Sequence, residues 1–255
     1  MADAKRSAWE EWGQVDPLWA IVTEGGKEFG NWDLSDFFAS GKASIDSLWS
    51  TATSNGIPGN HRIGLDFGCG VGRLTGPLGE HLDRVVGLDI SPTMIDLANR
   101  YNGERSNLIF QVHEGDTLSA FPDGHFDAVC SLLVLQHLPS HESISNYIRE
   151  FVRVLAPDGV LMMQLPDFVP EVTIHPGLRS RLRPRTRIAE TLHSLGVSPS
   201  FLYRALGWKP EMTMRALTKD RVLALIDEMG ATLVWSSEAS IDASGVSNVF
   251  YLATR

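Results

Sequence analysis

The chain has 255 residues, of which 43% are hydrophobic and 21% are charged, close to ordinary globular usage. This length suits one α/β domain with insertions, and we expect a packed hydrophobic core. The net charge of −9 argues against general nucleic-acid binding, because polyanions repel an acidic protein at long range.

The sequence predicts a cytoplasmic protein without a membrane partner. No apolar run approaches the roughly 18 residues that a membrane span needs, and the first residues lack the apolar stretch of a secretory signal. The two cysteines, Cys69 and Cys130, are too few for a disulfide framework and lack metal-ligand spacing. We therefore expect no bound metal.

Residues 1–60 are rich in tryptophan and end at the breaker Asn55-Gly56-Ile57-Pro58-Gly59. They are predicted to form a helical cap over the edge of a core that begins near residue 61. Apolar runs then predict strands over 63–67, 84–89, 107–113, 126–133 and 160–165. Helices are predicted over 91–101 and 144–155, and such alternation indicates a doubly wound parallel sheet.

The alternation stops between residues 166 and 215 and resumes with a helix over 220–229 and strands over 232–235 and 248–253. Residues 61–165 and 216–255 are therefore predicted to form one core, with 166–215 as an inserted lid or acceptor region. Pro77 falls within the helix expected after the first strand, where it is predicted to cause a kink.

The strongest local signal is the glycine-rich run Leu65-Asp66-Phe67-Gly68-Cys69-Gly70-Val71-Gly72-Arg73. Glycines after a first strand permit a tight turn and let a ligand approach the backbone. Asp89 closes the second strand, 21 residues after Gly68, where a carboxylate can accept hydrogen bonds from ribose hydroxyls. These features predict a cofactor that contains adenosine.

The spacing of the glycines and the positions of nearby acidic residues distinguish between two such cofactors, NAD and S-adenosylmethionine. The glycines are spaced G-x-G-x-G, whereas a dinucleotide fold typically has G-x-G-x-x-G. Asp66 would oppose a pyrophosphate but can complement an ammonium or sulfonium group. Asp116 follows the third strand, where an acid can bind the amino group of adenine. The pattern favours S-adenosylmethionine over NAD.

With these blocks in order, residues 61–165 resemble the class I methyltransferase family. The resemblance rests on Leu65–Thr75, Val85–Ser91, Glu114–Thr117, Phe126 to Pro139 and Leu155–Leu165. It implies a Rossmann-like, mostly parallel, seven-stranded sheet whose last strand is antiparallel. It also implies the following cofactor-binding residues: Asp66, Gly68, Cys69, Gly70, Gly72, Arg73, Asp89, Ile90, Met94, Asp116, Thr117, Ser131 and Leu132.

His137 lies just past the fourth strand, where a base beside the transferred methyl group is expected. The alternative is a structural histidine that caps the loop or lines the pocket. His175 and His193, in the insertion, are further candidates for contact with the acceptor. The tetrad [N/D]-P-P-[Y/F] of nucleic-acid amino-methyltransferases is absent, since this position reads Cys130-Ser131-Leu132-Leu133.

The expected function is therefore methyl transfer to a small acceptor, with oxygen favoured over nitrogen or carbon. Five arginines occupy alternate positions from Arg179 to Arg187. They are interpreted either as a solvated surface segment or as a binding site for an anionic acceptor. The N-terminal aromatic residues indicate core packing or a pocket for a sugar or aromatic group. Three rival functions stay open: an NAD-dependent oxidoreductase, a cofactor-binding protein without transferase activity, and an RNA methyltransferase.

Overall fold

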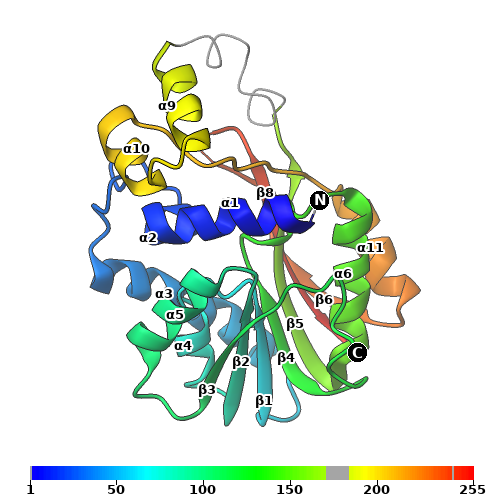
Figure 1. The fold of residues 1–255 in the computed structure, drawn as a ribbon. Coiled ribbons are helices and arrows are strands. Elements are labelled where there is room, and N and C mark those ends of the chain that lie inside the picture. The colour runs from blue at the N-terminus through cyan, green and yellow to red at the C-terminus, as the bar shows by residue number, and fades with distance from the viewer. Residues whose placement is uncertain (1, 171–183, 243) are drawn as a thin grey trace.

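The computed structural model describes residues 2–170, 184–242 and 244–255, in which helices cover both faces of a central sheet (Figure 1). The strands of this part of the chain are β1 (Ile63–Phe67), β2 (Arg84–Asp89), β3 (Leu108–Val112), β4 (Phe126–Ser131), β5 (Leu155–Phe168), β6 (Thr232–Ser236), β7 (Ser240–Ile241) and β8 (Ser247–Thr254). Their order is β3-β2-β1-β4-β5-β8-β6, and the short β7 pairs with β8. β8 is antiparallel to β5 and β6, whereas β1 to β5 pair in parallel. The predicted doubly wound sheet with an antiparallel last strand is confirmed, although in the described residues the short β7 adds an eighth strand to the expected seven.

Alternation along the strands creates two apolar faces. Leu65 and Phe67 of β1 face α6 (His141–Val154) and α11 (Lys219–Glu228), as part of one core cluster. The opposite face packs on α3 (Leu34–Ser54) and α4 (Thr75–Leu78). α5 (Pro92–Asn102) lies beside α3, where the Phe38 and Tyr101 rings meet at 5.9 Å. No helix in the described part of the chain is both long and apolar enough to cross a membrane.

The segment after the glycine loop departs from the expected kinked helix. α4 has four residues and contains Pro77, which cannot donate a backbone hydrogen bond. The fourth strand also ends two residues earlier than predicted. Leu133 has a positive φ of 64°, and its N–H donates to the Gln164 side chain at 2.8 Å. The chain therefore turns away from the sheet before His137.

The N-terminal helices α1 (Ala2–Val15) and α2 (Pro17–Ile21) cross one end of the sheet (Figure 1). α9 (Pro184–Ser194) and α10 (Pro199–Leu206) of the predicted insertion lie beyond them. Asp16 is buried and accepts a hydrogen bond from the Tyr203 hydroxyl at 2.8 Å. His193 lies 3.2 Å from the Glu11 carboxylate. These contacts join the N-terminal helices to the insertion above the sheet.

Candidate functional site

A cavity of about 360 Å³ opens at the carboxyl ends of the parallel strands. The strand order reverses here, because β1 pairs with β2 on one side and with β4 on the other. Open α/β sheets bind ligands at such switch points, and the volume is within the ordinary range for ligand sites, about 300–1,000 Å³. α1 and α2 contribute Trp9, Ala20 and Ile21 to its wall.

The glycine loop brings bare backbone to the cavity. Gly68 and Gly70 both have positive φ, at 75° and 52°, and both line the wall. A Cβ atom on Gly68 would lie 2.3 Å from Val134, and one on Gly70 would lie 2.5 Å from Ile21. A larger residue at either position would therefore clash with side chains that form the cavity.

Asp89 presents its carboxylate to the cavity from the end of β2. Its two oxygens accept hydrogen bonds from the N–H groups of Gly70 and Ser91, each at 2.9 Å. Burial raises the pKa of this carboxyl, while the N–H groups of Ser91 and Gly70 favour its charged form. The site thus holds an oriented hydrogen-bond acceptor that is linked to the glycine loop.

Asp66 does not line the cavity. Because side chains alternate along β1, it lies toward α4, where it is 1% exposed and accepts a hydrogen bond from Thr75 at 2.6 Å. Burial raises its pKa to about 6, although the hydrogen bond from Thr75 and the nearby charge of Arg73 lower it. Arg73 is itself buried and reaches Ser40 at 3.4 Å. Neither Asp66 nor Arg73 therefore lines the cavity.

The cavity brings together eight of the fourteen predicted site residues and leaves six outside its wall. Those on the wall are Gly68, Gly70, Asp89, Ile90, Met94, Asp116, Leu132 and His137. Those outside it are Asp66, Cys69, Gly72, Arg73, Thr117 and Ser131. Ser131 and Cys69 are buried beside the wall, whereas Thr117 is exposed.

The loop that carries Asp116 is held by α6. The Tyr147 hydroxyl donates to the Gly115 carbonyl at 2.5 Å and lies 3.4 Å from His113 Nε2. Burial raises the pKa of Tyr147 and lowers that of His113, so both groups are neutral near pH 7. Tyr147 was not predicted, because its contact joins residues 32 positions apart in the chain.

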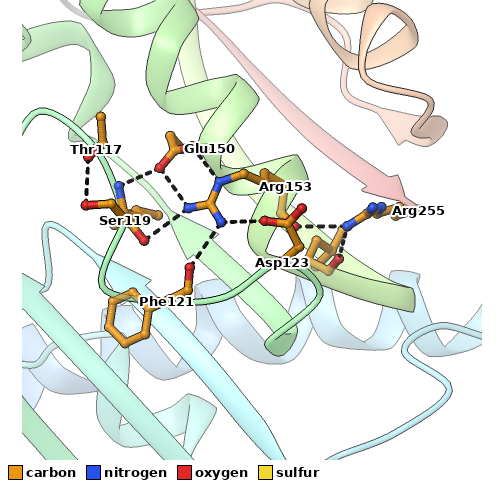
Figure 2. Close-up of polar contacts among 9 residues, drawn as sticks. Thr117, Ser119, Phe121, Asp123, Glu150, Arg153 and Arg255 are labelled. Atoms are coloured by element: carbon orange, nitrogen blue, oxygen red, sulfur yellow. Dashed lines mark hydrogen bonds and ion pairs between the residues drawn. The ribbon is translucent and has the colours of Figure 1, made fainter.

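A second group of contacts fixes the chain just after Asp116 (Figure 2). Glu150 accepts a hydrogen bond from the Leu118 N–H at 2.6 Å. Arg153 pairs with Glu150 at 2.7 Å and with Asp123 at 2.8 Å, and donates to the carbonyls of Leu118 and Phe121. In the sequence, the only sign of this network is the Glu150–Arg153 spacing on one helix face.

His137 ends a short 3₁₀ helix, η1 (Leu135–His137), on the cavity wall. Its Nδ1 lies 2.8 Å from the Thr213 carbonyl. A carbonyl can only accept, so Nδ1 carries the hydrogen and the lone pair of the neutral ring is on Nε2. The Trp9 ring meets the imidazole edge-on, with centroids 5.1 Å apart. The histidine is therefore held in one orientation beside an aromatic wall.

The residues that return from the insertion support this loop. The N–H of Arg215 donates to the Gln136 carbonyl at 2.7 Å, and its guanidinium donates to the Leu138 carbonyl at 3.1 Å. Sequence reasoning missed Thr213 and Arg215, because they are 76 and 77 positions from their partners His137 and Leu138. No local pattern could have indicated these pairs.

Among the described residues, the cavity wall has four carboxylate side chains and no lysine or arginine. The carboxylates belong to Asp89, Glu114, Asp116 and Glu142. Arg187 is exposed and, like His193, is not on the wall. His175 and Arg179, Arg181 and Arg183 lie outside the described residues, so their predicted contact with an acceptor stays a prediction.

Comparison with known proteins finds similarity over the part of the chain that supplies most of the cavity wall. Residues 65–163 match a family described as "Methyltransferase domain". A trans-aconitate 2-methyltransferase from Methylobacterium radiotolerans is 32% identical over 114 residues, which are 44% of this chain and 41% of that protein. A ubiquinone biosynthesis O-methyltransferase from Xanthomonas oryzae is 31% identical over 107 residues, 42% of this chain and 44% of that protein. The chain thus matches less than half the length of these relatives.

Two solved structures share the fold along nearly the whole chain. Magnesium protoporphyrin IX methyltransferase from Synechocystis, with bound S-adenosylhomocysteine, has a TM-score of 0.61 at 18% identity, covering 98% of this chain and 97% of that one. The N-methyltransferase NodS from Bradyrhizobium japonicum, in complex with S-adenosylhomocysteine, also has a TM-score of 0.61, at 17% identity, covering 99% and 98%. At these identities the likeness establishes the fold alone.

Proposed function

We propose, on the premise that residues 65–163 are a class I methyltransferase domain, that the chain transfers a methyl group from S-adenosylmethionine to a small-molecule acceptor. The observation that carries this proposal is the cavity at the switch point, where the glycine backbone, Asp89 and Asp116 meet. Asp89 can accept hydrogen bonds from ribose hydroxyls, and Asp116 can accept one from the adenine amino group. The wall residues therefore have the hydrogen-bonding groups that this cofactor requires.

Methyl transfer from this cofactor requires few catalytic groups on the protein. S-adenosylmethionine supplies an activated methyl group, so positioning and exclusion of water are the main contributions of the chain. A hydroxyl acceptor must also lose its proton as the new O–CH₃ bond forms. His137 is suited to take that proton, because Nδ1 donates to Thr213 and leaves the lone pair of the neutral ring on Nε2. The products are then the methyl ether and S-adenosylhomocysteine.

The described wall favours an uncharged acceptor over an anionic or glycosyl-phosphate one. The carboxylates of Asp89, Asp116 and Glu142 line the cavity, and they would repel a carboxylate or phosphate group on the acceptor. Trp9 and the apolar residues Leu138 and Pro139 offer an apolar surface near His137. A neutral metabolite that presents a hydroxyl group to His137 is the acceptor that fits this wall.

Calorimetry with S-adenosylhomocysteine and with NAD tests the cofactor. We expect the first to bind with micromolar affinity or better and NAD to bind weakly, because its pyrophosphate would meet the carboxylates of the wall. Tight NAD binding without S-adenosylhomocysteine binding would overturn the proposal in favour of an oxidoreductase.

Replacement of His137 tests the assignment of the base. With an acceptor identified from a panel of neutral hydroxylated compounds, His137→Ala should lower kcat by about 10²–10⁴-fold. The affinity for S-adenosylhomocysteine should stay near that of the parent protein. His141→Ala is a matched control, since His141 is exposed at the start of α6 and does not line the cavity. An equal loss of kcat and of cofactor affinity in His137→Ala would make His137 a binding residue.

A further inference from the structure

Glu10 of α1 makes an unusual set of contacts with the start of α5. One carboxylate oxygen accepts hydrogen bonds from the Ser91 hydroxyl at 2.7 Å and from the Thr93 N–H at 3.1 Å. The other oxygen accepts a hydrogen bond from the Thr93 hydroxyl. Partial burial opposes the charge, but the hydrogen bonds from Thr93 and Ser91 outweigh it and lower the pKa of Glu10. The carboxylate is therefore held firmly in its charged form.

The two helices also approach closely at this point. A Cβ atom on Gly13, one turn after Glu10 on α1, would lie 3.2 Å from both Ser91 and Thr93. Glycine thus allows α1 to lie against the first turn of α5. The hydrogen bonds of Glu10 and this close approach together fix the position of α1 above the sheet.

These contacts connect α1 to groups on the cavity wall. The Ser91 N–H donates to Asp89 at 2.9 Å, and the Ser91 hydroxyl accepts a hydrogen bond from the N–H of Met94. Asp89 and Met94 both line the cavity, as does Trp9, the neighbour of Glu10. Glu10 therefore joins the helix that covers the cavity to the segment that carries the proposed ribose-binding carboxylate.

We infer that Glu10 is a positioning residue for the cofactor: its bonds to Ser91 and Thr93 hold α1 over the cavity and order the Asp89 segment beneath it. This inference rests on the proposed function, because the cofactor is the one named there. Glu10 does not line the cavity, so its effect passes through Trp9 on one side and Asp89 on the other. Loss of the carboxylate should release α1 and let the bound nucleoside dissociate faster.

The experiment measures the binding and release of S-adenosylhomocysteine by the full chain, and needs no acceptor. Calorimetry gives the Kd, and stopped-flow tryptophan fluorescence gives the dissociation rate. Glu10→Ala should raise the dissociation rate by about tenfold, and Glu10→Gln by less, since an amide oxygen still accepts one hydrogen bond. Thermal unfolding followed by circular dichroism confirms that each variant is folded. A purely structural role would lower the melting temperature and leave the dissociation rate of the folded protein unchanged.

Two further variants separate the contact from a general effect. Thr93→Val removes one hydroxyl partner of Glu10 and should raise the dissociation rate in the same direction. Combined with Glu10→Ala it should add nothing, because both changes remove the same interaction. Glu80→Ala, which removes an exposed ion pair with Lys42 away from the cavity, should leave the rate unchanged.

Two different results would contradict the inference. If folded Glu10→Ala binds S-adenosylhomocysteine and releases it within about twofold of the parent rate, Glu10 does not position the cofactor. If the parent protein itself fails to bind S-adenosylhomocysteine, the proposed function is overturned, and the role of Glu10 falls with it.

Discussion

The buried carboxyl of Asp66 should make the stability of the protein depend on pH in a direction opposite to that of most acids. Burial raises its pKa from 3.8 to about 6 in the folded chain. Below pH 3.8 both the folded and the unfolded states bind the proton. Between the two pKa values the folded state binds more protons, so the free energy of unfolding falls as the pH rises. Above pH 6 the loss is complete.

The size of this loss follows from the two pKa values. Their difference is about 2.2 units, and each unit corresponds to 1.36 kcal/mol, which gives roughly 3 kcal/mol. Asp66→Asn cannot titrate, so its unfolding free energy should lack this fall. The difference between the parent protein and the variant should therefore shift by most of that amount between pH 4 and pH 8, in addition to any constant offset from the altered bond to Thr75.

Urea unfolding followed by circular dichroism at pH steps from 4 to 8 measures the effect. Asp96→Asn changes an exposed aspartate on α5 and controls for the substitution itself. Parallel pH profiles for the parent protein and Asp66→Asn would refute the reasoning, because they would show that Asp66 binds its proton equally in both states.

Three other substitutions test the site and the loops around it. Asp89→Asn should weaken S-adenosylhomocysteine binding by about tenfold in calorimetry, since the charged hydrogen-bond acceptor is lost while the fold is kept. Unchanged affinity would contradict the proposed role of Asp89 in ribose binding. Arg153→Ala should lower the free energy of unfolding in urea by about 2 kcal/mol, because Glu150 and the Leu118 and Phe121 carbonyls lose their donor. A loss no larger than that of a surface ion pair, about 0.5 kcal/mol, would show that water replaces the lost donor. Gly72→Ala should lower the free energy of unfolding by at least about 1–2 kcal/mol in the same assay, since φ is 84° and the added Cβ would lie 2.5 Å from the Asn102 amide. A variant as stable as the parent protein would mean that the loop relaxes freely.

The sequence predicts those parts of the fold that depend on local patterns. Strand β1, the glycine turn and the acid at the end of β2 each have a signature within a few residues, and the structure has all three. The antiparallel last strand came with the family resemblance rather than from the pattern of apolar residues. The short α4 follows from Pro77, whose consequence was anticipated as a kink and is instead a helix of one turn.

The site was less predictable where the direction of a side chain or a contact between distant residues decides which groups lie at the cavity. Asp66 was expected at the cofactor, but alternation along β1 directs it toward α4 and away from the cavity. Glu10 and Thr213 make hydrogen bonds with residues 83 and 76 positions away, respectively. Such pairs leave no periodicity or spacing in the chain, and only the folded structure brings them together.

The dependence of His137 on Thr213 and Arg215 also bears on how acceptor preference could be redesigned. Under the proposed function, a redesign of acceptor preference would exchange residues 166–215, and this stretch includes Thr213 and Arg215. A graft that keeps the sheet and the glycine loop intact would still lose the hydrogen bond that fixes the imidazole tautomer, unless its backbone passed His137 along the same path as Thr213. Chimeras should therefore return to the parent chain before Thr213, so that the segment through Leu217, whose N–H bonds to the Pro166 carbonyl at 2.9 Å, is kept, or should carry their own acceptor for the imidazole N–H.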